Sequence, residues 1–234
     1  MTFSTTTVLV TGAAGNLGRA LAAAFSARGA NLVLAGRKRE ELVASFGAED
    51  EHRLFATVDL LDQSSVDTAV ALSRERFRRI DVLCNIAGGF RMGEPVHEIS
   101  DKNWDFMLDV NARTLLHAAR AVVPQMIEGG GGKIVNVGAF SAQKGAAQMG
   151  AYIAAKSAVI RLTEAMAAEL REKNINVNCV LPTTIDTPEN RASMPKADPT
   201  RWVAPADLAN VIVFLASHDA RAIHGAAIPV TGLS

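Results

Sequence analysis

The chain has 234 residues, of which 49% are hydrophobic and spread along its whole length, and this predicts a folded protein with a sizeable core. The 24 basic and 24 acidic residues cancel, whereas a nucleic-acid-binding protein usually carries a basic excess. No apolar run reaches the roughly 18 residues of a membrane span, and the first residues lack the basic segment of a secretory signal, so we expect neither membrane insertion nor export.

Strand-like and helix-like segments alternate along the chain. Strands are predicted at residues 6–10, 31–35, 54–58, 81–86, 133–137, 175–181 and 227–230, and helices at 17–28, 38–46, 64–77, 103–127, 151–173 and 206–216. The strands are apolar at consecutive positions, as in a parallel sheet that helices cover on both faces. We therefore predict an α/β fold with one domain over residues 1–234, and we expect its functional residues beyond the carboxyl ends of the strands.

Residues 183–201 interrupt this alternation. The segment holds three prolines and no clear periodicity, which predicts a long loop that closes over a bound substrate. Cys84 and Cys179 lie far apart within apolar strand-like runs, which is typical of buried free thiols in a reducing compartment. We therefore expect a cytoplasmic protein.

The first strand leads into TGAAGNLG, with Gly12, Gly15 and Gly18 before the first helix. Glycine at these points permits a tight turn, the close approach of a pyrophosphate and close packing of helix on strand. The start of the helix then offers free N–H groups to phosphate oxygens. Many turns between strand and helix use glycine, but this one follows the first strand of a long alternation, which favours nucleotide binding.

The residues after the second strand bear on the choice of nucleotide. An acidic residue there would bind the ribose hydroxyls of NAD(H), but residues 37–39 are all basic and no acid comes before Glu40. Arg37 could bind a 2′-phosphate, so the sequence favours NADP(H) over NAD(H). The alternative is a group of solvated charges that opens a helix. Asp59, after the third strand, is a candidate for the adenine amino group.

Tyr152, the only tyrosine, and Lys156 are four residues apart on a predicted helix and so share a face. A nearby ammonium favours the phenolate, so we expect Lys156 to lower the pKa of Tyr152 toward the working pH of a general acid or base. The same spacing serves packing and solubility in many helices. Because the pair follows a glycine turn that favours nucleotide binding, we interpret it as catalytic.

The chain resembles the short-chain dehydrogenase/reductase family over nearly its whole length. The resemblance rests on TGAAGNLG, NIAG at 85–88, Asn111, YIAAK at 152–156 and the turn at Pro182, in this order. It implies a Rossmann-type, doubly wound sheet of seven parallel strands with helices on both faces, a nicotinamide cofactor and hydride transfer. It also implies that Tyr152 moves the proton, that Lys156 holds the cofactor ribose and tunes Tyr152, and that Asn111 supports a water beside Lys156.

The resemblance extends to the cofactor site. Asn85 is similar to a residue that ties neighbouring strands together, and Thr187 falls where the family often contacts the carboxamide. The residues expected to contact the cofactor are Gly12, Ala14, Gly15, Asn16, Leu17, Gly18, Arg37, Asp59, Leu60, Asn85, Ala87, Gly88, Tyr152, Lys156, Pro182, Thr183, Ile185 and Thr187.

Several positions depart from the family pattern. Asn16 stands where the compact branch has glycine, and Ala139 stands where the family has the serine that polarises the substrate carbonyl. Ser141, two residues later, is a doubtful replacement. Loss of such a hydrogen-bond donor costs transition-state stabilisation but leaves proton transfer by tyrosine in place. Dihydropteridine reductase, a family member that works without the serine, is loosely similar around MGAY at 149–152.

These features predict an NADP(H)-dependent oxidoreductase that acts on a carbonyl or alcohol of small-molecule size, with no metal, nucleic acid or membrane as partner. A weakly active or non-catalytic NADP(H) sensor and a reductase of quinonoid dihydropterin are the alternatives. Helices 103–127 and 151–173 are rich in small residues, among them Ala118, Ala119, Ala165, Ala167 and Ala168, and by resemblance they would build a homotetramer or dimer. The residues expected around a largely apolar or aromatic ketone are Phe90, Arg91, Phe140, Gln143, Met149 and Trp202, together with Ser141 and Thr183.

Overall fold

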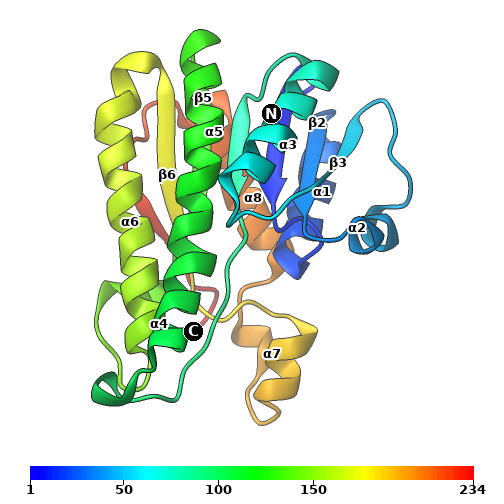
Figure 1. Cartoon of the computed structure of the whole chain (residues 1–234). Helices are drawn as coiled ribbons and strands as arrows, with labels where there is room; N and C mark the ends of the chain where they lie inside the picture. The colour runs from blue at the N-terminus through cyan, green and yellow to red at the C-terminus, as the bar shows by residue number, and fades with distance from the viewer.

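Seven parallel strands form one sheet in the computed structural model, which describes residues 1–234 (Figure 1). The sheet has the order β3-β2-β1-β4-β5-β6-β7, and every neighbouring pair is parallel. This confirms the predicted doubly wound sheet. The strands are β1 (Thr7–Thr11), β2 (Asn31–Gly36), β3 (Arg53–Thr57), β4 (Val82–Asn85), β5 (Gly132–Val137), β6 (Ile175–Pro182) and β7 (Ala227–Val230).

Helices cover both faces of the sheet because successive strand residues point to opposite faces. Val8 and Val10 pack with α1, α2 and α8, whereas Leu9 between them packs with α3, α5 and α6. The helices are α1 (Asn16–Ser26), α2 (Arg39–Phe46), α3 (Gln63–Phe77), α4 (Asp101–Leu108), α5 (Thr114–Glu128), α6 (Gly150–Leu170), α7 (Pro188–Ser193) and α8 (Pro205–Ala216). No helix is long and apolar enough to cross a membrane.

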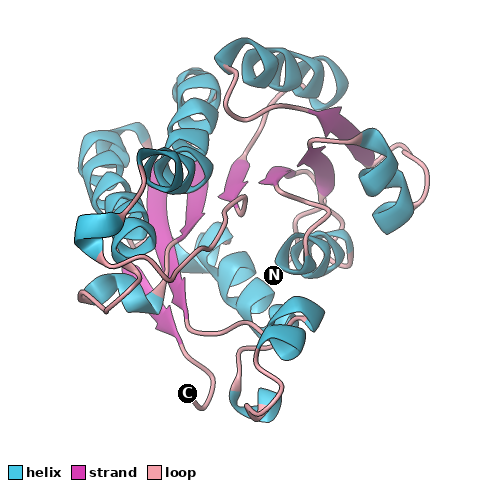
Figure 2. Cartoon of the chain, turned by 60° about the horizontal axis from the view of Figure 1, so that its bottom comes forward, coloured by secondary structure: helices cyan, strands magenta, loops and turns pink.

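The strand order reverses between β1 and β4, which lie side by side at the centre of the sheet. The Thr11 hydroxyl ties their ends together, since it accepts hydrogen bonds from the N–H groups of Ile86 (3.0 Å) and Ala87 (3.1 Å). Ligands of such sheets bind in the crevice outside the carboxyl ends at this reversal. Figure 2 views the molecule with this lower edge of Figure 1 brought forward.

The predicted helix over 103–127 is wrong in one respect, because the structure divides it. A π-helical turn at Asp109–Arg113 separates α4 from α5. The Asn111 side chain lies in this turn, and its Nδ2 donates to the Met107 carbonyl at 3.0 Å. A side-chain donor therefore binds a carbonyl four residues back, as the backbone N–H does in a regular helix.

Residues 183–201 are also more ordered than their sequence indicates. They include α7, which begins after Thr187 because the Thr187 hydroxyl accepts from the N–H of Asn190. Pro188 at the first helical position needs no N–H partner. One further contact holds this segment down: Asn16 at the start of α1 donates from Nδ2 to the Glu189 carboxylate at 2.8 Å. In Figure 1, α7 lies below the sheet, beyond the strand ends.

Candidate active site

The turn between β1 and α1 has the shape of an anion cradle. Gly12 has a φ of +65°, and a Cβ there would lie 3.0 Å from the Ala87 Cα. A Cβ at Gly18 would lie 2.5 Å from backbone oxygens of this turn. The N-cap of α1 is Gly15, so no side chain binds the first N–H groups of the helix, and its first turn holds no acidic residue. These residues fit the pyrophosphate of a dinucleotide, which needs free N–H groups and no nearby side chain.

Only one of the three basic residues after β2 is available to a ligand. Arg39 pairs with Glu49 and lies over the Phe55 ring, and Lys38 pairs with Glu41 at 3.1 Å. Arg37 is exposed and makes no ion pair or side-chain hydrogen bond. The predicted cation therefore stands free at the end of the strand.

The end of β3 contributes Asp59 and Leu60. The Asp59 carboxylate accepts from the Leu61 N–H at 2.9 Å, which keeps that side chain in its own loop. The Leu60 carbonyl contacts the buried His117 ring at 3.0 Å. The loop beside which an adenine would bind is therefore held to α5 through His117.

Asn111, Gly88 and Lys156 meet below the end of β4. A Cβ on Gly88 would lie 2.9 Å from Asn111 Oδ1 and 3.2 Å from Lys156 Nζ, so only glycine leaves both polar atoms in place. Asn111 Oδ1 accepts from the Gly89 N–H at 3.2 Å, and its Nδ2 donates to the Gly89 carbonyl at 3.0 Å. The structure therefore brings these three predicted residues together.

Lys156 is buried, with 6% of its surface exposed, and its ammonium donates to the Val137 carbonyl at 2.8 Å. Burial lowers the pKa of Lys156 to about 8, and the neighbouring Cys179 thiol, whose own pKa burial raises to about 11, opposes this only weakly. Near neutral pH the amine is therefore close to its own titration point. Neither Val137 nor Cys179 was expected here, because a backbone carbonyl and an apolar strand carry no sequence signal for a lysine contact.

Tyr152 lies in the first turn of α6, one turn before Lys156, as the spacing predicts. The Phe90 ring packs edge-on against it with ring centres 4.8 Å apart. Its hydroxyl makes no hydrogen bond within the chain and is not fully enclosed, so it keeps its hydrogen-bonding capacity for a ligand. The predicted lowering of its pKa is wrong for the chain alone: burial raises the pKa of Tyr152 to about 12.

Ala139 follows β5 and is buried at 4% exposure against Ala142, Val159 and Ile160, with Tyr152 packed on the same cluster. Ala139 and Tyr152 therefore belong to the same apolar cluster. Ser141 lies in the following 3₁₀ turn, is half-buried and makes no hydrogen bond. The structure does not join its hydroxyl to Tyr152.

Some of the remaining predicted residues make hydrogen bonds within the chain, and others are exposed. Asn85 donates to Asn136 on the neighbouring strand at 2.9 Å, the tie between strands that was expected. The Thr183 hydroxyl donates to the Thr231 carbonyl, and the Thr187 hydroxyl caps α7, so both are engaged within the chain. Of the expected substrate residues, Phe90, Arg91, Phe140 and Gln143 are exposed, Met149 precedes α6, and Trp202 lies beside Gly232 of the C-terminal segment.

Two further residues near the site escaped the sequence analysis. Thr11 enters the prediction only as the first residue of TGAAGNLG, although its buried hydroxyl joins the ends of β1 and β4. Glu189 follows Thr-Pro, a pair that signals a helix start and could have revealed α7. Its contact with Asn16 spans 173 residues of sequence and has no local signal.

A glycine cradle at the reversal of strand order in a parallel sheet places this protein in the class of nucleotide-binding α/β proteins. The sequence profile described as short chain dehydrogenase matches residues 6–198. The chain therefore belongs to the short-chain dehydrogenase family.

Relatives of established name agree with this assignment. The chain is 36% identical to D-threitol dehydrogenase of Mycolicibacterium smegmatis, over 96% of this chain and 90% of the relative. It is 30% identical to levodione reductase of Leifsonia aquatica, over 98% and 94% of the two chains. Both names describe oxidoreductases, and both relatives match almost from end to end.

Solved structures give the same result. Carveol dehydrogenase from Mycobacterium avium, in complex with NAD, superposes with a TM-score of 0.89 at 28% identity, over 97% of this chain and 96% of that chain. A 3-ketoacyl-(acyl-carrier-protein) reductase from Brucella melitensis, complexed with NADH, superposes with a TM-score of 0.87 at 28% identity, over 97% of each chain.

Proposed function

We propose that this protein is a nicotinamide-dependent oxidoreductase that interconverts a small carbonyl compound and its alcohol, with Tyr152 as the general acid and base. The observation that carries the proposal is the unpaired Tyr152 hydroxyl, one helical turn from the buried Lys156 and beside the glycine cradle. The names of the relatives, which are dehydrogenases and reductases, support the same class of reaction.

A bound nicotinamide supplies the hydride donor or acceptor. In the reduction, Tyr152 Oη donates a hydrogen bond to the substrate oxygen and then gives up its proton, because the raised pKa keeps the phenol protonated at neutral pH. In the proposed reduction Lys156, one turn along α6 from Tyr152, stabilises the phenolate that results. Gly88, which has no side chain, leaves room for both Lys156 Nζ and Asn111 Oδ1.

The form of the cofactor is a finer proposal. Solved relatives at 28% identity hold NAD and NADH, which supports the nicotinamide class. Our preference for NADP(H) rests on Arg37, the one unpaired cation after β2. Because hydrogen bonds to charged groups contribute about 1.5–3 kcal/mol, Arg37→Ala should weaken NADPH binding by about tenfold or more and NADH binding little. Equal losses for both cofactors would overturn the preference, and Arg171→Ala, an exposed arginine elsewhere, is the control.

The experiment that tests the activity compares wild type with Tyr152→Phe. Oxidation of NADPH and NADH is followed at 340 nm with a carbonyl panel that includes ketones, aldehydes and a quinonoid dihydropterin. We expect turnover that Tyr152→Phe reduces by about a hundredfold or more, the usual contribution of a positioned proton donor. Tight NADPH binding without turnover of any carbonyl would favour the sensor instead.

A second candidate function is the reduction of a quinonoid dihydropterin, and the lack of a hydroxyl at Ala139 favours it. A substrate that needs little polarisation of its carbonyl does not need the hydroxyl that Ala139 lacks. Turnover of the dihydropterin alone would select this candidate over a general carbonyl reductase.

We further propose a cytoplasmic homotetramer, or a dimer, built through the helices of 103–127 and 151–173. The structure sorts the alanines named for this contact: Ala118, Ala119 and Ala167 are buried within the subunit, whereas Ala165 and Ala168 are exposed on α6. Of these five alanines, only Ala165 and Ala168 are exposed enough to contact a partner subunit. We propose that residues 183–201, which contain α7, form the substrate loop beyond the strand ends.

A further inference from the structure

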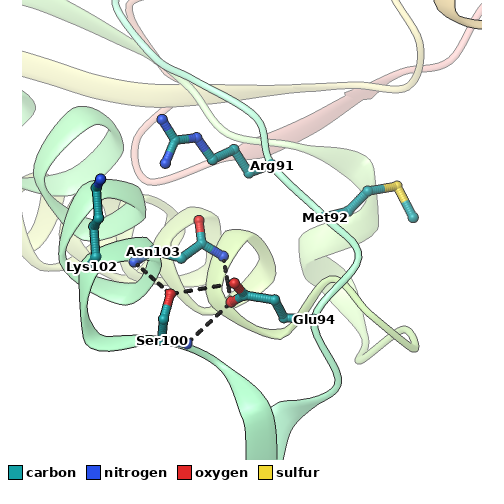
Figure 3. A pocket seen from close by; sticks show the side chains of 6 residues that line it. All are labelled: Arg91, Met92, Glu94, Ser100, Lys102 and Asn103. Carbon is teal, nitrogen blue, oxygen red and sulfur yellow. Dashed lines mark hydrogen bonds between the residues drawn. The ribbon is translucent and has the colours of Figure 1, made fainter.

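We propose that the cavity between the β4–α4 loop and α4 binds a carboxylate of the substrate, so that the substrate is an oxo acid or hydroxy acid with one anionic group. The inference rests on the proposed function and names its substrate class. The cavity has a volume of about 400 Å³ and opens to solvent (Figure 3). Its lining residues are Arg91, Met92, Glu94, Ser100, Lys102 and Asn103.

The position of the cavity links it to the reacting centre. Phe90 packs against the Tyr152 ring, and the next residue, Arg91, lines the cavity. Phe90 and Arg91 are consecutive residues, so the same loop contacts Tyr152 and lines the cavity, and the length of the carbon chain that would join the two is measured by varying it. The loop thus presents an aromatic ring to one part of a substrate and a cation to the next.

The lining of the cavity carries two cations and one carboxylate, so its net charge is positive. Arg91 and Lys102 make no ion pair and no side-chain hydrogen bond, unlike Arg113, which pairs with Asp109. The only acidic residue of the lining, Glu94, is already engaged: its carboxylate accepts from the Ser100 N–H, the Ser100 hydroxyl and Asn103 Nδ2, at 3.2, 3.3 and 3.0 Å. No carboxylate of the chain therefore takes the place that an anionic ligand would fill.

The guanidinium of Arg91 is held in place before any ligand binds. Its central carbon lies 3.7 Å from the centre of the Phe106 ring, so the group stacks on α4. Stacking uses the face of the guanidinium and leaves its N–H groups free for a carboxylate, which arginine binds in a bidentate fashion. A cation positioned in advance loses less conformational entropy on binding than a solvated one.

An unpaired acceptor marks the same cavity as a polar site. Asn103 Oδ1 is buried and has no hydrogen-bond donor within the chain, although Nδ2 of the same amide is bound to Glu94. Figure 3 shows this oxygen on the Arg91 side of the cavity, away from Glu94. A buried acceptor without a partner is costly, and because this oxygen is closed to solvent, a ligand reaches it only if the Asn103 side chain moves toward the cavity.

These observations refine the substrate predicted from the sequence. The exposed Phe90 ring packs against the tyrosine and suits an apolar or aromatic body. The cavity adds one anionic group to that body. The combination describes an aryl or alkyl oxo acid rather than a neutral ketone or a polyanion.

The test compares each acid with its neutral ester. Phenyl oxo acids with two, three or four carbons between ketone and carboxylate, and their methyl esters, are assayed for kcat/KM with NADPH and NADH. For the best chain length we expect the acid to exceed its ester by at least tenfold in wild type. In Arg91→Leu the ratio of acid to ester should fall close to one, in Arg91→Lys it should recover in part, and in the control Arg171→Leu it should match wild type.

Binding is measured separately so that failure of the activity can be told from failure of the site. The non-reactive phenylalkanoates of the same chain lengths are titrated by calorimetry in the presence of the cofactor. Saturable binding that Arg91→Leu abolishes, without turnover of any oxo acid, supports the cavity and rejects the proposed activity. Turnover with no preference for the acid, or a preference that survives Arg91→Leu, overturns the inference while the proposed activity stands.

Discussion

Ala139 stands at the position where the resemblance implies a serine. Its methyl group is buried in a cluster against which Tyr152 also packs. We predict that Ala139→Ser raises kcat/KM for a ketone by about tenfold or more, because a positioned donor to the substrate oxygen contributes several kcal/mol. Ala142→Ser, in the same cluster, is the control and should leave the rate unchanged. No gain in Ala139→Ser would mean that a different donor already polarises the substrate.

Tyr152 can be observed directly because it is the only tyrosine. Burial raises its pKa to about 12, so at pH 10.5 the folded chain should show almost no phenolate absorbance at 295 nm, whereas the denatured chain, with a tyrosine pKa of about 10, should show most of it. Since the unfolded state releases its proton first, this group lowers the free energy of unfolding as the pH rises from about 10 toward 12. A folded protein with half its phenolate formed by pH 9 would contradict the prediction.

Single residues were the most predictable part of the site wherever their chemistry is carried by side chains. Tyr152 and Lys156 were predicted from their types and spacing and Asn111 from the family resemblance, and the structure gathers Lys156 and Asn111 around Gly88. The direction of the tyrosine pKa was missed because it depends on burial, which the Phe90 ring and the Ala139 cluster create through tertiary contacts. The Val137 carbonyl that holds Lys156 could not be predicted, since every residue carries the same group.

At the scale of elements, α7 bears on cofactor binding through Glu189. This carboxylate accepts from Asn16 at the start of α1, where the cofactor pyrophosphate is proposed to bind. Hydrogen bonds from its own backbone N–H and from Thr187 hold the pKa of Glu189 below its usual range, so it is charged at neutral pH. The negative charge should oppose the pyrophosphate.

We predict that Glu189→Gln tightens NADPH binding by about two- to fivefold, the scale of an exposed charge interaction, because glutamine keeps an oxygen for Asn16 but removes the charge. Titration by fluorescence at low and high salt measures this, and the gain should shrink as salt screens the charges. Glu172→Gln, an exposed glutamate far from α1, is the control. Weaker binding in Glu189→Gln would show that the contact positions the segment for the cofactor instead.

The element boundaries show where periodicity is informative. The ends of the strands and of most helices were predicted to within three residues. Apolar runs mark the segments that are buried on the two faces of the sheet, and glycines mark where helices end. The division of 103–127 was missed, since the apolar residues continue across it and only the Asn111 side chain reveals the turn.

For the whole molecule, we predict four copies of the 24.7 kDa chain in solution, or two, with α6 in the contact. Ala165→Arg should lower the mass toward the monomer, since an arginine on this exposed face cannot be buried against a partner helix without a counter-charge. Light scattering coupled to size exclusion gives the mass. Ala71→Arg, on the exposed side of α3, should leave it unchanged. A monomeric wild type would reject the contact.

The overall topology could be predicted because a parallel sheet needs two covered faces and right-handed crossovers, which leave few arrangements for seven strands separated by helices. The cavity beside Arg91 could not, because it needs the β4–α4 loop to lie across α4 and Arg91 to stack on Phe106. In sequence, Arg91 is indistinguishable from an ordinary charged loop residue.

The π-helical turn at Asp109–Arg113 has a consequence for how this chain tolerates change. Such a turn is equivalent to one extra residue in an otherwise continuous helix. Deleting one residue there would let regular α-helical hydrogen bonds run from α4 into α5 and would remove the bulge in which Asn111 lies. Asn111 would then leave Gly88 and Lys156. The regular helix and the placement of Asn111 therefore favour different lengths of the same segment.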